Sequence, residues 1–220
     1  MKDFKGLEKK EKNHLELDLN SLNAGFDFSY AKNRNSNYKN VASFDASEIK
    51  SEKVLLEIFG KLKEKFSIEN YVLKKVWLVK SEFETVDEGR LPFIPHIDKE
   101  RYLKFMVYVT DVTEKDGPFF SCTEVNDIEV YESLRKKIQH SSKEKKRNVI
   151  KDFSIDFYKP IVGCMGDLII FDTNLPHFAG AIDKGRERKV IRFDFEKSNW
   201  NKKSIKSYVK NIANFTKVKK

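Results

Sequence analysis

The sequence predicts a mainly β domain, a sandwich or barrel that carries helices at its ends. Short runs of β-branched and aromatic residues recur after residue 70, each bounded by turn residues, and few helices separate them. Many short strands of this kind are typical of double-sheet and barrel architectures. With 220 residues, 40% of them hydrophobic and 18 of them phenylalanine, the chain can bury a sizeable core as a single domain.

The N-terminal part of the chain contains one predicted helix. Residues 1–40 are polar and rich in Asn and Lys, so we expect a polar N-terminal segment without a core of its own. The stretch 44–66 is amphipathic, and Asp45 and Glu48 have the spacing of a helix capping pair. The apolar residues expected on one face of this helix are Ile49, Leu55, Ile58, Phe59, Leu62 and Phe66.

The rest of the chain is predicted to be strands, with two more helices. The expected strands are residues 71–79, 102–110, 154–162, 167–172 and 188–196. A polar helix is expected at 128–148. The basic tail, 197–220, spaces its apolar residues as a further helix that packs on the outside. We therefore expect one domain over residues 1–220.

The net charge of +9 and the pI near 9.3 raise the question of a nucleic-acid partner. Much of the excess lies in residues 135–147 and in the tail, and no zinc-finger spacing, aromatic RNA-binding pattern or basic zipper accompanies it. These runs are typical of a solvated surface. No apolar stretch has the length of a membrane helix, and two cysteines make no disulfide framework. We expect a cytoplasmic protein without a membrane span.

The stretch "PFIPHIDKE" places His96 and Asp98 two residues apart. In an extended segment both side chains point to the same side, so they offer an imidazole and a carboxylate to one point. A six-coordinate Fe(II) that also binds a cosubstrate and O2 needs three protein ligands on one face. His177, which follows an apolar strand after Gly166-Asp167, is the candidate third ligand. The alternative is a chance His-x-Asp pair on a charged surface.

Two arginines follow the candidate third ligand on the next predicted strand. Arg188 and Arg192 lie four residues apart, so their guanidinium groups project from the same face of that strand. A planar guanidinium is suited to bind a carboxylate end-on through two parallel hydrogen bonds. The alternative is that Arg188 pairs with Glu187 or Asp194 on a solvated edge strand.

In their order and spacing, these residues resemble the Fe(II)/2-oxoglutarate-dependent oxygenases of the phytanoyl-CoA dioxygenase-like family. The resemblance covers residues 77–195. It rests on His96-x-Asp98, the "VYVTDVTEKDGPF" strand and turn, Gly166-Asp167, His177 and an arginine 11 residues later. It implies a double-stranded β-helix, which is a cupin-like jelly roll with flanking helices. It also implies iron bound by His96, Asp98 and His177, with Arg188 on the distal carboxylate of the cosubstrate 2-oxoglutarate and O2 as second cosubstrate.

The resemblance further implies hydroxylation of a C–H bond, with release of succinate and CO2. A carboxylate at Asp98 favours hydroxylation or desaturation, because related halogenases have a small residue at that position. The chain departs from the family pattern at "FFSCTEV", where a Pro-Gly-Ser-His-like stretch is common. It also departs at Ala179, where many members have a hydroxyl residue that contacts the cosubstrate. Tyr108, in phase with Met106 and Thr110, is the candidate replacement for that contact.

The sequence does not identify the primary substrate. Residues 81–95 lead into the His-x-Asp pair and are expected to line the mouth of the site, with Phe83, Arg90 and Phe93 as candidate contacts. Arg192 is the candidate contact for a negatively charged substrate, and helix 128–148 is a candidate lid. We expect a small-molecule or carrier-linked substrate. Two alternatives stay open: a catalytically idle binding module, and an oxygenase that acts on a polyanion such as nucleic acid.

Overall fold

Two antiparallel β-sheets and a helix make up most of the described structure. The computed structural model describes residues 12–14, 41–51, 53–66, 68–83, 86, 91–122, 150 and 154–197. The strands are β1 (Lys12–His14), β2 (Val41–Asp45), β3 (Tyr71–Glu82), β4 (Leu103–Tyr108), β5 (Phe119–Cys122), β6 (Tyr158–Ile161), β7 (Asp167–Asp172), β8 (His177–Ala179) and β9 (Glu187–Lys197). The helical elements are η1 (Glu48–Ser51), α3 (Lys53–Lys65) and η3 (Ile155–Phe157). This architecture confirms the predicted mainly β class.

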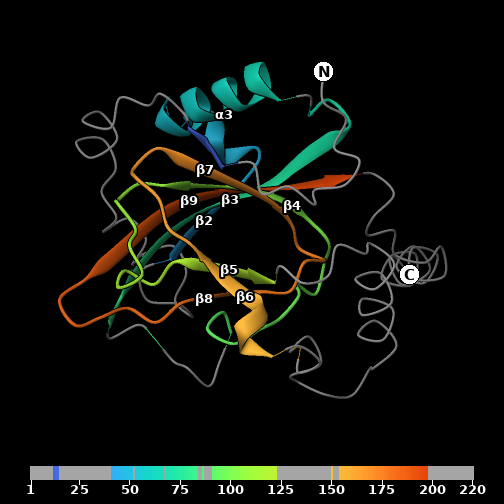
Figure 1. Cartoon of the computed structure of the whole chain (residues 1–220). Coiled ribbons are helices and arrows are strands. Elements are labelled where there is room, and N and C mark those ends of the chain that lie inside the picture. The colour runs from blue at the N-terminus through green and yellow to red at the C-terminus, as the bar shows by residue number, and fades with distance from the viewer. Residues whose placement is uncertain are drawn as a thin grey trace, which may run out of the picture.

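The helix and the sheets lie in three layers. The six-stranded sheet has the order β1-β7-β4-β9-β3-β2, and the three-stranded sheet has the order β6-β5-β8. Helix α3 covers one face of the large sheet, and the small sheet lies on its other side (Figure 1). Strand β4 lies between β7 and β9, and β9 lies between β4 and β3. Strands β4 and β9 are therefore the central pair of the large sheet, and their inner faces meet the small sheet.

Strand β4 packs against other elements on both of its faces, because all its residues are buried. Phe105 and Val107 belong to the core under α3, whereas Met106 and Tyr108 belong to a second apolar cluster between the sheets. The Phe105 ring meets that of Phe195 edge-on, with centroids 5.1 Å apart. Fully burying one such ring stabilises the fold by about 1.5–3 kcal/mol. The alternation also turns Lys104 toward the inner face, although its strand is otherwise apolar.

The predicted helix over 44–66 is correct in its apolar face and wrong in its start. Residues 41–45 form strand β2, which pairs with β3, and α3 begins at Lys53. The expected capping pair is present: the Asp45 backbone N–H donates to the Glu48 carboxylate, 2.7 Å away, where the chain enters the short helix η1. All six predicted face residues lie in or against the core under α3. Strand β2 contains a β-branched residue, Val41, and an aromatic one, Phe44, which favour strands. Their pairing with β3 outweighs the helix propensity of this stretch.

The predicted strands are found, and four short ones were not predicted. Strand β7 has the predicted bounds 167–172, and β3, β4, β6 and β9 overlap their predicted ranges. The prediction missed β1, β2, β5 and β8 as strands. The predicted helix 128–148, the tail beyond residue 197 and nearly all of segment 1–40 lie outside the described residues. Within the described residues, no helix has both the length and the apolar character needed to cross a membrane.

A tight turn connects the inner strand β4 to the small sheet. Its side chains are tied locally, because the Asp116 carboxylate accepts a 2.9 Å hydrogen bond from the backbone N–H of Thr113. Gly117 follows with a φ of 68°. A Cβ at this position would lie 2.4 Å from a side-chain carbon of Ile182 and 2.7 Å from the carbonyl oxygen of Gly180. The turn therefore requires glycine for both its backbone conformation and its close packing.

We expect Gly117→Ala to lower the free energy of unfolding by several kcal/mol. A left-handed conformation costs a non-glycine residue about 1–2 kcal/mol, and overpacking adds about 1–3 kcal/mol. Gly185→Ala is the matched control, because Gly185 has a φ of 79° but no atom near the added Cβ. Urea unfolding measures both variants. Equal losses would show that the neighbours of Gly117 move aside at no cost.

Candidate metal centre

Two short chain segments bring the first and third candidate ligands together. His96 and His177 lie opposite each other in an isolated antiparallel bridge. The backbone N–H of His96 donates to the His177 carbonyl at 3.0 Å, and that of His177 donates back at 2.9 Å. The two imidazole rings consequently lie on the same side, with centroids 4.5 Å apart. A single pair of main-chain hydrogen bonds therefore fixes two side chains that are far apart in sequence.

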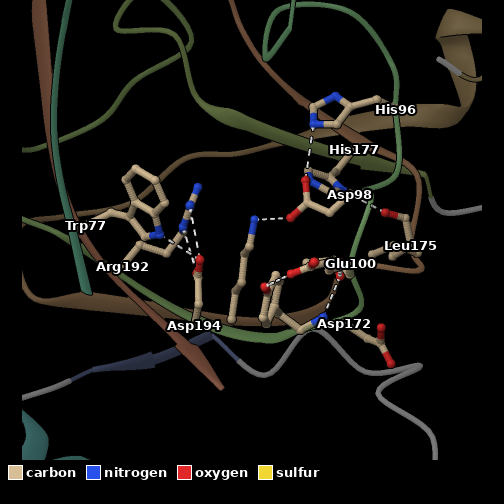
Figure 2. Close-up of polar contacts among 12 residues, drawn as sticks. Trp77, His96, Asp98, Glu100, Asp172, Leu175, His177, Arg192 and Asp194 are labelled. Carbon is tan, nitrogen blue, oxygen red and sulfur yellow. Dashed lines mark hydrogen bonds and ion pairs between the residues drawn. The ribbon is translucent and has the colours of Figure 1, made fainter. Parts of the chain in front are cut away.

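Asp98 completes a group of three possible metal ligands. Its Oδ1 atom lies 3.7 Å from Nε2 of His96 and 3.8 Å from Nε2 of His177. One ligand atom from each residue lies within 4.8 Å of the others. Figure 2 shows the three side chains pointing toward one another. The expected parallel orientation of residues 96 and 98 is therefore present, and the structure gathers the three predicted residues at one point.

The hydrogen bonds of the imidazole rings leave their Nε2 atoms available as ligands. Nδ1 of His96 donates to the Ile94 carbonyl, and Nδ1 of His177 donates to the Leu175 carbonyl, each at 2.7 Å. Placing the ring proton on Nδ1 directs an unprotonated Nε2 toward Asp98. Burial lowers the pKa of both histidines, and most strongly that of His177. Both are therefore neutral near pH 7, which is the form that binds a metal.

A buried lysine pairs with the second oxygen of the carboxylate. Nζ of Lys104, on β4, donates to Oδ2 of Asp98, and the lysine is only 3% exposed. Burial opposes ionisation of Asp98, but the charge and hydrogen bond of Lys104 and the charge of Arg192 outweigh it, so the pKa of this carboxyl is well below its usual range. The carboxylate is thus anionic, with Oδ1 toward the imidazoles and Oδ2 toward the lysine.

Arg188 lies deeper between the sheets, at the start of β9. It is only 6% exposed, and Nη1 donates to the carbonyl of Gly117 in the tight turn. Its Nε atom is buried and has no hydrogen-bond partner within the described part of the chain. Burial lowers the pKa of the guanidinium, yet arginine starts so high that it stays charged. A buried cation with an unused donor is a suitable partner for an anion.

Tyr108, the candidate replacement contact, is fully buried beside this arginine. Its hydroxyl donates to the carbonyl of Ile161 at 2.6 Å and accepts from the backbone N–H of Phe119 at 3.3 Å. The pKa of Tyr108 is raised, with burial as the main cause and the charge of Arg188 opposing it. Its one proton is therefore already used within the protein. The hydroxyl can accept a further hydrogen bond but has no proton left to donate to a carboxylate.

Arg192 lies four residues further along β9 than Arg188, and its charge acts on Asp98. Its guanidinium donates from Nε to Oδ1 of Asp194 at 2.9 Å and packs over the Trp77 ring, 5.2 Å from the centroid. The indole N–H of Trp77 donates to the same carboxylate at 2.7 Å, so the three residues form one cluster (Figure 2). The predicted pairing of Asp194 thus involves Arg192, and Arg188 does not pair with it within the described residues.

The other predicted contacts are only partly described. Phe93 is half-buried, and it lies in the segment whose Pro92 carbonyl accepts a 2.9 Å hydrogen bond from the Ala179 backbone N–H. Phe83 is 49% exposed at the end of β3. Arg90 lies outside the described residues. Residues 91–95 therefore run beside strand β8, next to the metal group, as expected of a segment at the mouth.

The sequence interpretation missed two buried polar residues of the site, Lys104 and Ser121. The signal for Lys104 was present: it is the only charged residue in "LKFMVY" and alternates in phase with Met106 and Tyr108. The signal for Ser121 was weaker, because β5 is four residues long and was not predicted as a strand. Without its strand, the face to which Ser121 points could not be assigned.

No protein-family model matches the chain, and no curated protein matches it. HygX from Streptomyces hygroscopicus, crystallised with nickel and 2-oxoglutarate bound, is similar in structure, with a TM-score of 0.53 and 11% identity over 82% of this chain and 78% of HygX. AviO1 from Streptomyces viridochromogenes Tue57 gives a TM-score of 0.51 and 14% identity over 88% of this chain and 90% of AviO1. For EvdMO1, this chain spans 30% of its length, with a TM-score of 0.40 and 16% identity over 64% of this chain. The first two similarities show a shared fold.

We expect Lys104→Met to lower the free energy of unfolding of the metal-free protein by about 3 kcal/mol, because it leaves a largely buried carboxylate unpaired. Adding Asp98→Asn to Lys104→Met removes that lone charge and should recover a large part of the loss. Urea unfolding in the presence of a chelator measures the wild type, both single variants and the double variant. Strictly additive losses would show that the two side chains do not interact energetically.

Proposed function

We propose that this chain is an Fe(II)- and 2-oxoglutarate-dependent dioxygenase of the phytanoyl-CoA dioxygenase-like family that hydroxylates or desaturates a C–H bond. The observation that carries the proposal is the buried group His96, Asp98 and His177, with its ligand atoms within 4.8 Å of one another. Two neutral imidazoles and one carboxylate are the donor set of non-haem Fe(II) oxygenases. The fold shared with HygX, a protein that binds nickel and 2-oxoglutarate, supports the same reading.

The strand order supports a double-stranded β-helix formed by residues 1–220 as one domain. Following the chain, β4 lies in the large sheet, β5 and β6 in the small sheet, β7 in the large, β8 in the small and β9 in the large. The bridge at His96 adds a further segment beside β8. Such alternation between two facing sheets is the arrangement of a jelly roll. It places the candidate ligands on inner-facing segments.

The metal would be held by Nε2 of His96, Nε2 of His177 and Oδ1 of Asp98. Iron supplies the activation of O2 that these side chains cannot supply, with succinate and CO2 formed from 2-oxoglutarate. The chain contributes geometry: the two Nδ1 hydrogen bonds orient the imidazoles. Lys104 donates a hydrogen bond to Oδ2 of Asp98, so Oδ1 is the oxygen left for the metal. Burial of both histidines excludes water from this side of the site.

The cosubstrate would lie between the metal group and Arg188. The buried guanidinium, with its unused Nε, would bind the distal carboxylate of 2-oxoglutarate. Tyr108 would line this end of the site, and its hydrogen bond to the Ile161 carbonyl would hold its ring in place. Arg192 is about 13 Å further along the strand at ~3.3 Å per residue, too far to hold the same carboxylate.

The primary substrate would enter on the side of Arg192. This arginine is partly exposed and packs on the Trp77 ring, so it offers a cation and an apolar surface together. Phe93 and Arg90, in the segment before the metal ligands, would complete the mouth. These contacts suit a small-molecule or carrier-linked substrate with an anionic group.

We expect His96→Ala and His177→Ala each to abolish Fe(II)-dependent conversion of 2-oxoglutarate to succinate, because three ligands leave no spare protein donor. His140→Ala, the same change at a histidine to which no role is assigned, should keep full conversion. Succinate release and bound iron are measured on the same samples. Full succinate production with normal iron content in either ligand variant would refute the metal assignment.

We expect Arg188→Ala to raise the apparent KM for 2-oxoglutarate by about 10- to 100-fold, the effect of losing a charge-assisted pair. Arg192→Ala, the matched change on the same strand face, should leave that KM within about twofold and affect the primary substrate instead. Melting curves of both metal-free variants control for folding. A large loss of affinity in Arg192→Ala with none in Arg188→Ala would reverse the two roles.

A further inference from the structure

Ser121, on strand β5, has a fully buried hydroxyl that makes no hydrogen bond with the described residues. Its exposed fraction is 0%, and its Oγ atom has no partner within the described part of the chain. Buried polar side chains almost always have a partner, so an unsatisfied one points to a ligand or to bound water. Removal of a hydroxyl from water without a new hydrogen bond costs about 1–3 kcal/mol. The fold therefore tolerates Ser121 at a cost.

The alternation of β5 turns Ser121 toward the metal group. Phe119, two residues earlier, faces inward, because its ring lies 4.3 Å from that of Phe171 and 5.6 Å from that of His177. Phe120 faces outward, where it stacks on Phe178 with centroids 4.7 Å apart. Side chains two residues apart share a face of a strand. Ser121 thus lies on the inner face with Phe119.

The register of the small sheet places Ser121 directly beside a candidate metal ligand. Ser121 is the cross-strand partner of His177 in the antiparallel pair of β5 and β8. Side chains directly opposite in such a pair have Cβ atoms about 4.5–5.5 Å apart. The Nδ1 atom of His177 is already bonded to the Leu175 carbonyl, so the serine is not its orienting partner. The hydroxyl thus lies on the same face of the small sheet as the His177 imidazole.

Two buried donors therefore lack a hydrogen-bond partner among the described residues, one on each sheet. Ser121 Oγ comes from the small sheet near the metal group, and Arg188 Nε comes from the large sheet near the Gly117 turn. The other nearby hydroxyl, that of Tyr108, donates its proton to the Ile161 carbonyl. At position 179, beside Pro92, an alanine offers no side-chain donor, because its backbone N–H already donates to the Pro92 carbonyl. Ser121 is thus a hydroxyl beside the metal group whose proton has no acceptor among the described residues.

We propose that Ser121 is a cosubstrate-binding residue, whose hydroxyl donates a hydrogen bond to the metal-side carboxylate of 2-oxoglutarate while Arg188 binds the distal carboxylate. This inference rests on the proposed function. It assigns the two ends of the dicarboxylate to two donors on opposite sheets. Hydrogen bonds to a charged acceptor are stronger than those between neutral groups, and the low dielectric of a buried site strengthens them further.

The experiment compares two variants with two ligands. Binding of 2-oxoglutarate and of 2-oxobutyrate, which lacks the distal carboxylate, is measured by anaerobic calorimetry on Ni(II)-loaded protein. Ser121→Ala should weaken the binding of both ligands about tenfold. Arg188→Ala should weaken the binding of 2-oxoglutarate alone. The matched control is Tyr158→Phe, which removes a buried hydroxyl from the outer face of the same sheet and should change neither affinity.

Stability measurements separate a ligand role from a structural one. Because Ser121 Oγ makes no hydrogen bond within the described residues, Ser121→Ala should keep or raise the melting temperature of the ligand-free protein and keep its Ni(II) affinity. It should lose part of the rise in melting temperature that 2-oxoglutarate produces in the wild type. A drop in ligand-free stability with an unchanged ligand-induced rise would show a structural role instead.

Each remaining outcome has a definite meaning. Unchanged affinity of Ser121→Ala for both ligands overturns the role of Ser121 and leaves the proposed function standing. Weakened binding of 2-oxoglutarate but not of 2-oxobutyrate overturns the assignment of Ser121 to the metal-side carboxylate. A wild-type protein that binds Ni(II) but neither ligand overturns the proposed function itself, and this inference with it.

Discussion

The candidate site depends on one pair of main-chain hydrogen bonds, between His96 and His177. The two residues exchange N–H···O bonds at 3.0 and 2.9 Å, and this fixes both imidazoles on one side of the bridge. A shift of the register by one residue would turn one ring to the other face of the sheet. Asp98 follows in phase with His96 and reaches the same point. The site is therefore a consequence of strand register, which the apolar strands around it hold.

The buried charges of the fold differ in whether they have a partner of opposite sign. Asp98 has Lys104 as its partner, and Asp194 has Arg192, so each of these carboxylates is matched by a cation. Arg188 has no carboxylate partner within the described residues, and burial lowers the pKa of its guanidinium. Charges out of water cost several kcal/mol each unless they are paired. Among the buried cations of the described structure, Arg188 is thus the one that an incoming anion would stabilise most.

The sequence predicted the strands and site residues whose signals are local, and it failed where pairing partners decide. Strand β7 is a continuous apolar run between turn residues, so its bounds 167–172 were predictable. Strands β5 and β8, with four and three residues, are too short for a periodic signal and exist because they pair with each other. Residues 44 and 45 were predicted as the start of a helix but belong to β2, which pairs with β3. The His-x-Asp spacing was visible, whereas the bridge that joins it to His177 was not.

Unsatisfied donors beside the candidate ligands are best understood as preorganisation. Ser121 Oγ and Arg188 Nε are both buried without a partner in the described structure, and each raises the free energy of the ligand-free fold. The apolar clusters on both faces of β4 supply the stability that tolerates this cost. A ligand that meets these donors gains their hydrogen bonds without having to order them first. The two donors lie on opposite sheets, and the proposed cosubstrate, a dicarboxylate, has an acceptor group at each end. Under the proposed function, one such molecule would meet both donors, a requirement that the metal ligands alone do not set.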